Sequence, residues 1–163
     1  MRTDDECRCY INHIVAQHRR LHAMLREMRD AIVGSVQPDE TPSFGRIVRV
    51  LVKLREELEQ HFAQEEGGGC LDEAVSRCPS LSSEVKRIEA EHPKILAQLD
   101  GLIHQAQSLL PTPQNQLPLQ RAFDQLCRDL QQHETAENRL LAQGFGIQPN
   151  GDVTEFTPLI HDV

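Results

Sequence analysis

The sequence of 163 residues has few aromatic side chains and no long apolar run. It contains no tryptophan, one tyrosine and five phenylalanines, so Leu, Ile and Val must fill most of the interior. That composition suits packing between helices. No apolar stretch approaches the roughly 20 residues of a membrane-spanning helix, and the first residues lack the apolar core of a secretory signal. We therefore expect a cytoplasmic protein without membrane association.

Clusters of basic residues and paired cysteines are also missing. The chain has 17 Lys and Arg against 25 Asp and Glu, a formal net charge of −8. We therefore expect neither nucleic acid nor an anionic membrane surface as its main partner. Its five cysteines are an odd number without the C-x-x-C spacing of structural zinc sites, so we expect reduced thiols. The length suits a single domain with one hydrophobic core.

Apolar residues recur at helical spacing in four stretches of the chain. The first predicted helix follows Asp4, a suitable N-cap, and ends near Gly34, a suitable residue to follow a helix. The second has Thr41 as N-cap and Pro42 at its first position. It runs to Glu66, where three successive glycines stop it because they carry too much backbone entropy.

The second half of the chain shows a similar pattern after a short connecting helix, which we predict over residues 70–77. A third long helix begins near Ser82 and is kinked by Pro93. The proline-rich run 111–118 separates it from a fourth helix, which ends at Gly144-Phe145-Gly146. The predicted fold is all-α, an antiparallel up-down four-helix bundle over residues 1–145, followed by an irregular tail over residues 146–163.

Polar residues interrupt the apolar stripes of these helices at matching depths. His61 and Glu65 are four residues apart, which on a helix is about 400° of rotation and about 6 Å of rise. They therefore share the face that carries the apolar residues. His133 and Glu137 repeat this arrangement on the fourth helix. The candidate set is His18, His61, Glu65, His92, His133 and Glu137, with His22 as a seventh member on the first stripe.

The spacing of these residues also indicates an internal repeat. His18 and His92 are 74 residues apart, and His61 and His133 are 72 apart. The repeat predicts a pseudo-twofold axis through the bundle, with the candidate ligands facing each other across it. Buried, unpaired carboxylates are too costly to keep ionised, whereas two divalent cations would neutralise them and accept neutral imidazoles. The sequence predicts a two-metal site, and its donors suit iron, manganese or zinc.

The order of these residues separates two kinds of metal-binding bundle. Di-iron sites of the ferritin kind need Glu-x-x-His on two helices, and at the candidate ligands only Glu89-x-x-His92 matches. The pattern H…H-x-x-x-E…H…H-x-x-x-E instead resembles the hemerythrin-like domain with its HHE cation-binding motif, over residues 11–145. The resemblance implies two non-haem iron ions (Fe²⁺/Fe³⁺), oxo- or hydroxo-bridged. Glu65 and Glu137 would be the bridging carboxylates, and His18, His61, His92 and His133 the terminal ligands.

The chain departs from the oxygen-carrying hemerythrins in its histidine count. Their third helix has a second histidine four residues after the first, where this chain has Leu96. Their fourth-helix carboxylate is an aspartate five residues after its histidine, whereas Glu137 comes at four. His22 is the pseudo-symmetric counterpart of the missing histidine. We therefore expect one iron to carry three histidines and the other two, the sets being His18, His22 and His61, and His92 and His133.

An iron centre with an open coordination position in a Leu, Ile and Val pocket can bind O₂ reversibly. We expect a protein that binds O₂ or a related small molecule, NO or peroxide, for sensing, storage or detoxification. Two alternatives stay open at this stage. One is a di-iron redox enzyme of the peroxidase or NO reductase type, and the other is an iron-handling protein.

Residues near the candidate ligands are candidates for holding the imidazole rings. Glu57 and Asp129 each lie four residues before a ligand histidine, where a carboxylate can accept the second imidazole N–H. A role as solvated flanking residues is the alternative for both. Glu66 and Glu134 adjoin candidate ligands but point about 100° away from the shared face, so we do not count them in the predicted site.

Overall fold

The computed structural model describes residues 4–34, 44–67 and 69–146, and every regular element in these ranges is helical. The prediction of an all-α protein is confirmed. In the described ranges, no helix combines the length and apolar character needed to cross a membrane. The elements are α1 (Asp4–Gly34), α2 (Gly45–Glu66), α3 (Cys70–Arg77), the 3₁₀ turn η1 (Pro79–Leu81), α4 (Ser82–Glu89), α5 (His92–Ser108) and α6 (Pro113–Phe145).

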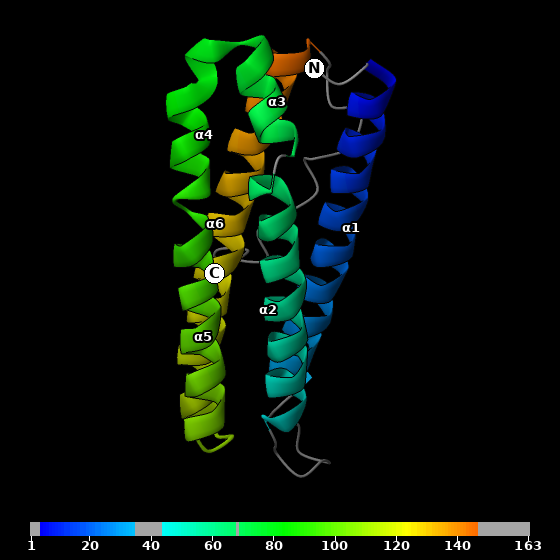
Figure 1. Ribbon diagram of the computed structural model, residues 1–163. Helices are drawn as coiled ribbons and strands as arrows, with labels where there is room; N and C mark the ends of the chain where they lie inside the picture. Colours follow the sequence, from blue (N-terminus) through cyan, green and yellow to red (C-terminus); the bar gives the residue numbers. More distant parts are fainter. Residues whose placement is uncertain (1–3, 35–43, 68, 147–163) are drawn as a thin grey trace, which may run out of the picture.

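Four helices, α1, α2, α5 and α6, lie side by side along one axis (Figure 1). Helix α2 packs against α1 and α5, and α6 packs against α5 and α1. At the end of the molecule where α1 begins, α3 lies beyond α2 and α4 lies beyond α5 (Figure 1). Both short helices pack against α6. The long helix α6 therefore contacts α5 and α4 in succession, and it also contacts α1 and α3.

The observed helix bounds agree with the sequence at several positions. Helix α1 ends at Gly34, and the connecting helix α3 spans the predicted residues 70–77. The proposed caps Thr41 and Pro42 lie outside the described residues. At the other end of α2, a β-carbon on Gly69 would lie 2.4 Å from the hydroxyl oxygen of Tyr10. The chain can leave α2 at this point because a glycine allows that close approach.

Two predictions about prolines are wrong. Residues 82–108 form two helices with a turn at Ala90 and Glu91, so Pro93 occupies the first turn of α5 instead of kinking a continuous helix. The run 111–118 also overlaps α6, which starts at Pro113 and contains Pro118. A proline costs little in the first turn of a helix, where its missing N–H has no intrahelical partner. Pro93 and Pro113 therefore mark helix starts, whereas Pro118 lies inside α6.

The buried apolar residues form two separate clusters. We define the long-helix core as the buried apolar residues of α1 from Leu21 on, of α2 up to Phe62, of α5 from Ile95 on, and of α6 from Leu119 to Leu130. The end core lies among α3, η1, α4 and the adjoining parts of α1 and α6. It consists of Ile14, Cys70, Leu71, Ala74, Leu81, Val85, Ile88, Leu140 and Leu141.

The buried polar residues lie between these two cores on α1, at the end of α2, where α4 is followed by α5, and on α6. His18 comes between Ile14 and Leu21, and His92 comes between Ile88 and Ile95. His133 and Glu137 lie between the long-helix and end-core segments of α6, while His61 and Glu65 occupy the last turns of α2. The chain thus places one polar layer at the boundary of two apolar regions.

Candidate metal centre

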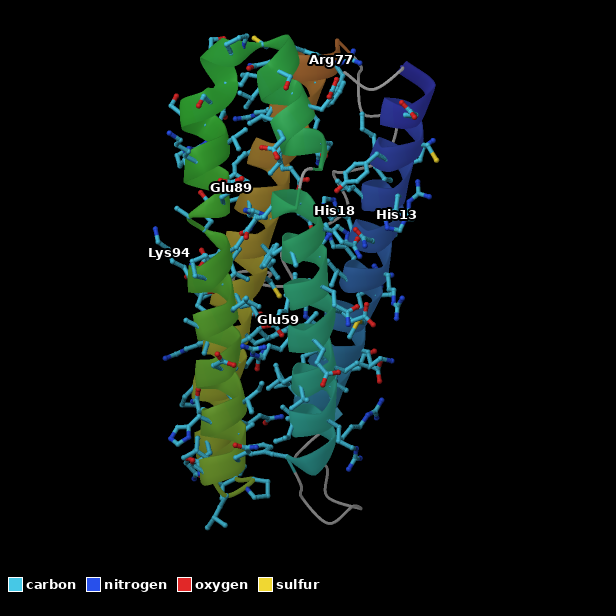
Figure 2. All side chains as sticks on the ribbon, viewed as in Figure 1. His13, His18, Glu59, Arg77, Glu89 and Lys94 are labelled. Carbon is cyan, nitrogen blue, oxygen red and sulfur yellow. The ribbon has the colours of Figure 1, made fainter. Side chains whose placement is uncertain are left out.

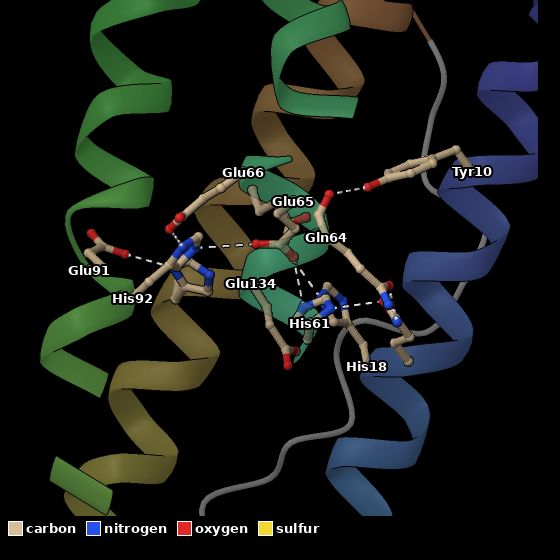
Figure 3. A network of polar contacts seen from close by, with 12 residues as sticks. Tyr10, His18, His61, Gln64, Glu65, Glu66, Glu91, His92 and Glu134 are labelled. Atoms are coloured by element: carbon tan, nitrogen blue, oxygen red, sulfur yellow. Dashed lines mark hydrogen bonds and ion pairs between the residues drawn. The ribbon is translucent and has the colours of Figure 1, made fainter. Parts of the chain in front are cut away.

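Six of the seven predicted site residues meet in this layer and form two groups of possible metal ligands. Figure 3 labels His18, His61, Glu65 and His92 among them. Within each group, one ligand atom from every residue lies within 4.8 Å of all the others. Glu65 belongs to both groups. All six side chains are buried, the most exposed being His18 at 6%. The first group is His18, His61, Glu65 and Glu137, and the second is Glu65, His92 and His133.

The carboxylate of Glu65 connects the two groups directly. Its Oε1 lies 2.7 Å from Nε2 of His61, one helical turn earlier on α2. Its Oε2 lies 3.2 Å from Nε2 of His92 on α5. In the first group, Nε2 of His18 lies 3.0 Å from Nε2 of His61 and 3.4 Å from Oε2 of Glu137. The imidazoles therefore present their Nε2 atoms towards the two carboxylates.

Six buried ligand atoms of the layer have no hydrogen-bond partner in the described part of the chain. They are both carboxylate oxygens of Glu65 and of Glu137, and Nε2 of His92 and His133. Leaving one buried polar atom unsatisfied costs about 1–3 kcal/mol, so six of them together favour binding of a charged group among them. Nitrogen and carboxylate donors of this kind match the preferences of divalent transition metals, so the residues present fit bound metal.

The charges of the layer also favour a bound cation. Burial and the nearby charge of Glu65 raise the pKa of Glu137, and His18 only partly opposes this. Burial would raise the pKa of Glu65 as well, but the imidazoles of His61 and His92 at contact distance hold it well below its usual range. Burial lowers the pKa of His18, yet the contact with Glu137 and neighbouring acidic charges raise it to about 9. Without a metal ion, protonated histidines must balance the negative charge of the buried carboxylates.

Three of the candidate ligand histidines are held through their second nitrogen by residues of other helical segments. Nδ1 of His61 lies 2.9 Å from Oε1 of Gln17. Nδ1 of His92 lies 2.7 Å from Oε1 of Glu66, and Nδ1 of His133 lies 3.0 Å from Oε2 of Glu91. Oxygen acceptors at Nδ1 place the imidazole proton there, which leaves the Nε2 lone pair free for a metal ion.

The predicted roles of Glu57 and Asp129 as imidazole acceptors are wrong. Glu57 accepts a hydrogen bond from Arg20, and Asp129 accepts hydrogen bonds from Gln98 and Gln125. The observed acceptors are sequence neighbours of site residues. Glu66 was not counted in the predicted site because it points away from the shared face, and this direction is what lets it reach His92 on α5. A residue about 100° around the helix from a core-facing ligand points towards the neighbouring helix.

His22 is the predicted site residue that the two groups do not include. Its Nε2 lies 2.7 Å from Oε2 of Glu134 on α6, and the side chain is about one-fifth exposed. Figure 2 shows His18 on the side of α1 that faces α2, whereas His13 lies on the outer side. The expected role of His22 as a metal ligand stays a prediction.

The hydrogen bonds continue from Gln17 to the end of α2. Nε2 of Gln17 donates to Oε1 of Gln64 at 2.7 Å, and the hydroxyl of Tyr10 donates to the backbone oxygen of Gln64 at 2.8 Å (Figure 3). Both contacts join α1 to the last turn of α2. The hydrogen bond from Gln17 also fixes its amide oxygen in the direction of His61.

Comparisons with protein-family models, curated proteins and solved structures gave no match for this chain.

Proposed function

We propose that this chain is a hemerythrin-like protein that holds two iron ions in the polar layer and binds O₂ or a related small molecule, NO or peroxide, for sensing, storage or detoxification. The observation that carries the proposal is the pair of buried ligand groups that share Glu65. A carboxylate shared between two groups of imidazoles suits a two-metal site, because its two oxygens can bind one ion each. The bound ions would supply electrons to the small molecule and an open coordination position for it.

The proposal assigns the six clustered residues as ligands. His18 and His61 would hold one ion and His92 and His133 the other. Glu65 and Glu137 would bridge the two ions, as the resemblance implies. The ring of Phe62 stacks on His92 with ring centres 4.0 Å apart and helps to exclude water from that side. The two apolar cores close the layer from above and below.

An antiparallel up-down four-helix bundle with an internal repeat is part of the same proposal. Supporting it, the repeat pairs His18 with His92 and His61 with His133, and these residues lie at one level of the molecule. Each half contributes a histidine from one helix and a His-x-x-x-Glu pair from the next. The expected third histidine on one ion, His22, would enlarge its shell if Glu134 released it.

The first experiment is metal analysis of the protein loaded with Fe²⁺ without oxygen, followed by optical spectra before and after O₂. We expect two iron ions per chain and a visible absorption band that appears with O₂ and disappears when O₂ is removed. A matched pair of variants separates the site from the surface. His92→Ala should lose iron, whereas Glu59→Gln, on the exposed side of α2, should keep it.

The same experiment distinguishes the proposal from its alternatives. Repeated consumption of peroxide or NO with an added reductant would indicate a redox enzyme. Release of iron on reduction would indicate an iron-handling protein. A chain that takes up no transition metal, although it is folded, would refute the proposal.

A further inference from the structure

The residues that hold the imidazoles follow one rule around the molecule. Gln17 adjoins His18 on α1 and reaches His61 on α2, and Glu66 adjoins Glu65 on α2 and reaches His92 on α5. Glu91, next to His92, reaches His133 on α6. Glu134, next to His133 on α6, contacts His22 on α1 and so closes the ring of contacts. We call these four contacts, made by Gln17, Glu66, Glu91 and Glu134, the acceptor ring.

The acceptor ring is chemically uneven. His61, in the first ligand group, has a neutral amide oxygen at its Nδ1. His92 and His133, the two histidines of the second group, both have carboxylates there. A carboxylate accepts a stronger hydrogen bond from the imidazole N–H than an amide oxygen does. The imidazole ring therefore has more electron density, and its other nitrogen is a stronger donor to a metal ion.

From this difference we infer that Glu66 and Glu91 make the two iron positions unequal, so that the ion at His92 and His133 is oxidised to Fe³⁺ first. The inference rests on the proposed function. Two carboxylates outside the ligand set, Glu66 and Glu91, contact the histidines on this side, against one on the other side, Glu134 at His22. The second position therefore has more negative charge as well as stronger donors. Both effects stabilise Fe³⁺ more than Fe²⁺. The reduction potential of the ion at His92 and His133 is therefore lower than that of the other ion.

The surroundings support separate roles for the two acceptor types. Gln17 is fixed by its own hydrogen bond to Gln64, so its amide oxygen faces His61. Glu66 is about half exposed, and Glu91, which is less exposed, has Arg87 at 4.0 Å. Neither carboxylate is buried as the ligands are, so either can be replaced without opening an apolar core. Glu66 and Glu91 act as positioning residues because they affect the ion only through His92 and His133.

The test is a stepwise oxidation of the reduced di-iron protein by ferricyanide under argon, each Fe²⁺ giving one electron to one ferricyanide. Electron paramagnetic resonance follows the mixed-valent state. We expect two separate one-electron steps in the unmodified protein. Glu66→Gln and Glu91→Gln keep the side-chain shape and remove the charge, and each should raise the first potential by at least a tenfold change in equilibrium constant, about 59 mV.

The reverse variant and a control make the test specific. Gln17→Glu gives His61 a carboxylate, so it should lower the second potential and bring the two steps together. Glu59→Gln removes one charge from an exposed position on α2 and should leave both potentials unchanged. A purely structural role of Glu66 and Glu91 would change iron content or melting temperature without moving either potential, and that result would overturn the inference.

The outcomes for the two proposals are distinguishable. Two bound irons with potentials that the variants do not move would refute the uneven ring while leaving O₂ binding intact. Two unequal irons without any optical response to O₂, NO or peroxide would support the ring and refute the proposed function. A folded protein that does not load iron would refute both.

Discussion

The two apolar cores differ in how their helices are built. The long-helix core lies between uninterrupted helices, where Leu54 of α2 and Leu99 of α5 are fully buried. The end core uses short pieces, α3, η1 and α4, against the ends of α1 and α6. Short helices are marginal by themselves and depend on tertiary packing. The difference indicates that the stability of the end core depends more on the parts of the molecule packed against it. The polar layer, which lies between the two cores, is one of these parts.

The breaks in the helices fall where the polar layer lies. Helix α2 ends at Glu66, directly after Glu65, and the turn between α4 and α5 ends directly before His92. The layer therefore joins segments that the backbone does not hold in one helix. If metal ions bind in the layer, they connect the end core to the long-helix core through side chains, and the following changes test that dependence.

Removal of the metal ions should have the largest effect. A ligand at 1,000 times its dissociation constant stabilises a fold by about 4 kcal/mol, which for a chain of this size is a melting-temperature difference of about 10 °C. We expect a chelator to lower the melting temperature by roughly this amount, measured by circular dichroism. An unchanged melting temperature in a protein that had contained iron would contradict the proposed dependence.

Chelation should also open the two cores unequally. Cys70 in the end core and Cys127 in the long-helix core are both buried cysteines. Burial raises the pKa of Cys127 to about 12. After metal removal, a thiol reagent should label Cys70 before Cys127, with exposed Cys9 as the positive control. Equal rates for the two buried thiols would show that the cores open together.

Truncation of one leucine in each core is the next test. Leu54 and Leu71 are both fully buried, so each change to alanine should cost about 3 kcal/mol where the whole core unfolds with it. Leu54→Ala should show this loss in global denaturant unfolding. Leu71→Ala should show less global loss but faster amide exchange in α3 and weaker iron retention. Identical behaviour of the two variants would remove the distinction between the cores.

The pH dependence of metal uptake tests the layer itself. His18 faces Glu137, with Glu134 and Glu65 nearby, and its pKa rises from 6.5 to about 9, so the ion-free protein holds a proton there at neutral pH. If His18 is a metal ligand, as proposed, a metal ion must displace that proton. Affinity for Mn²⁺ should therefore increase about tenfold per pH unit and level off near pH 9, measured by calorimetry.

The sign of the effect on stability is the opposite. Since the pKa of His18 is raised by folding, its contribution to the stability of the ion-free protein is complete below pH 6.5 and is lost as the pH rises through about 9. His18→Asn should abolish both slopes. Mn²⁺ affinity that is independent of pH in the unmodified protein would show that His18 binds no proton that metal displaces.

A matched pair of glycines should give the smallest effects. A β-carbon on Gly144 of α6 would lie 2.6 Å from Cβ and 3.0 Å from Cα of Ala74, so Gly144→Ala forces α3 away from α6. A β-carbon on Gly101 of α5 meets nothing within 4 Å. We expect Gly144→Ala to destabilise the fold by about 1 kcal/mol and Gly101→Ala to stabilise it by about 0.5–1 kcal/mol in denaturant unfolding. The same sign for both would contradict the close packing of the end core.

The parts of the site that follow from helical periodicity could be predicted from the sequence. His61 and Glu65 share a face because four residues make a little more than one turn, and the structure places both in the buried layer. The acceptors Gln17, Glu66 and Glu91 could not be found in the same way. Their role depends on which helix lies beside which, and the apolar stripe of one helix does not contain that information.

The turn before His92 was missed for a different physical reason. A proline inside a periodic stretch fits either a kinked helix or the start of a new one, because the apolar pattern continues across it. His22 shows the same limit, since its position on the stripe does not distinguish a metal ligand from a partner of Glu134. The signal for that pair was Glu134 itself, an acidic residue next to a predicted ligand.

The acceptor ring has a mechanical consequence. Each contributing segment both gives an oxygen to the next helix and has a histidine held by the previous one, so none can turn about its own axis without breaking contacts on two sides. A rotation that loosened His92 would also withdraw Glu91 from His133. The four helical paths are therefore coupled in orientation, and disturbance of a single ligand should spread around the whole layer instead of staying local.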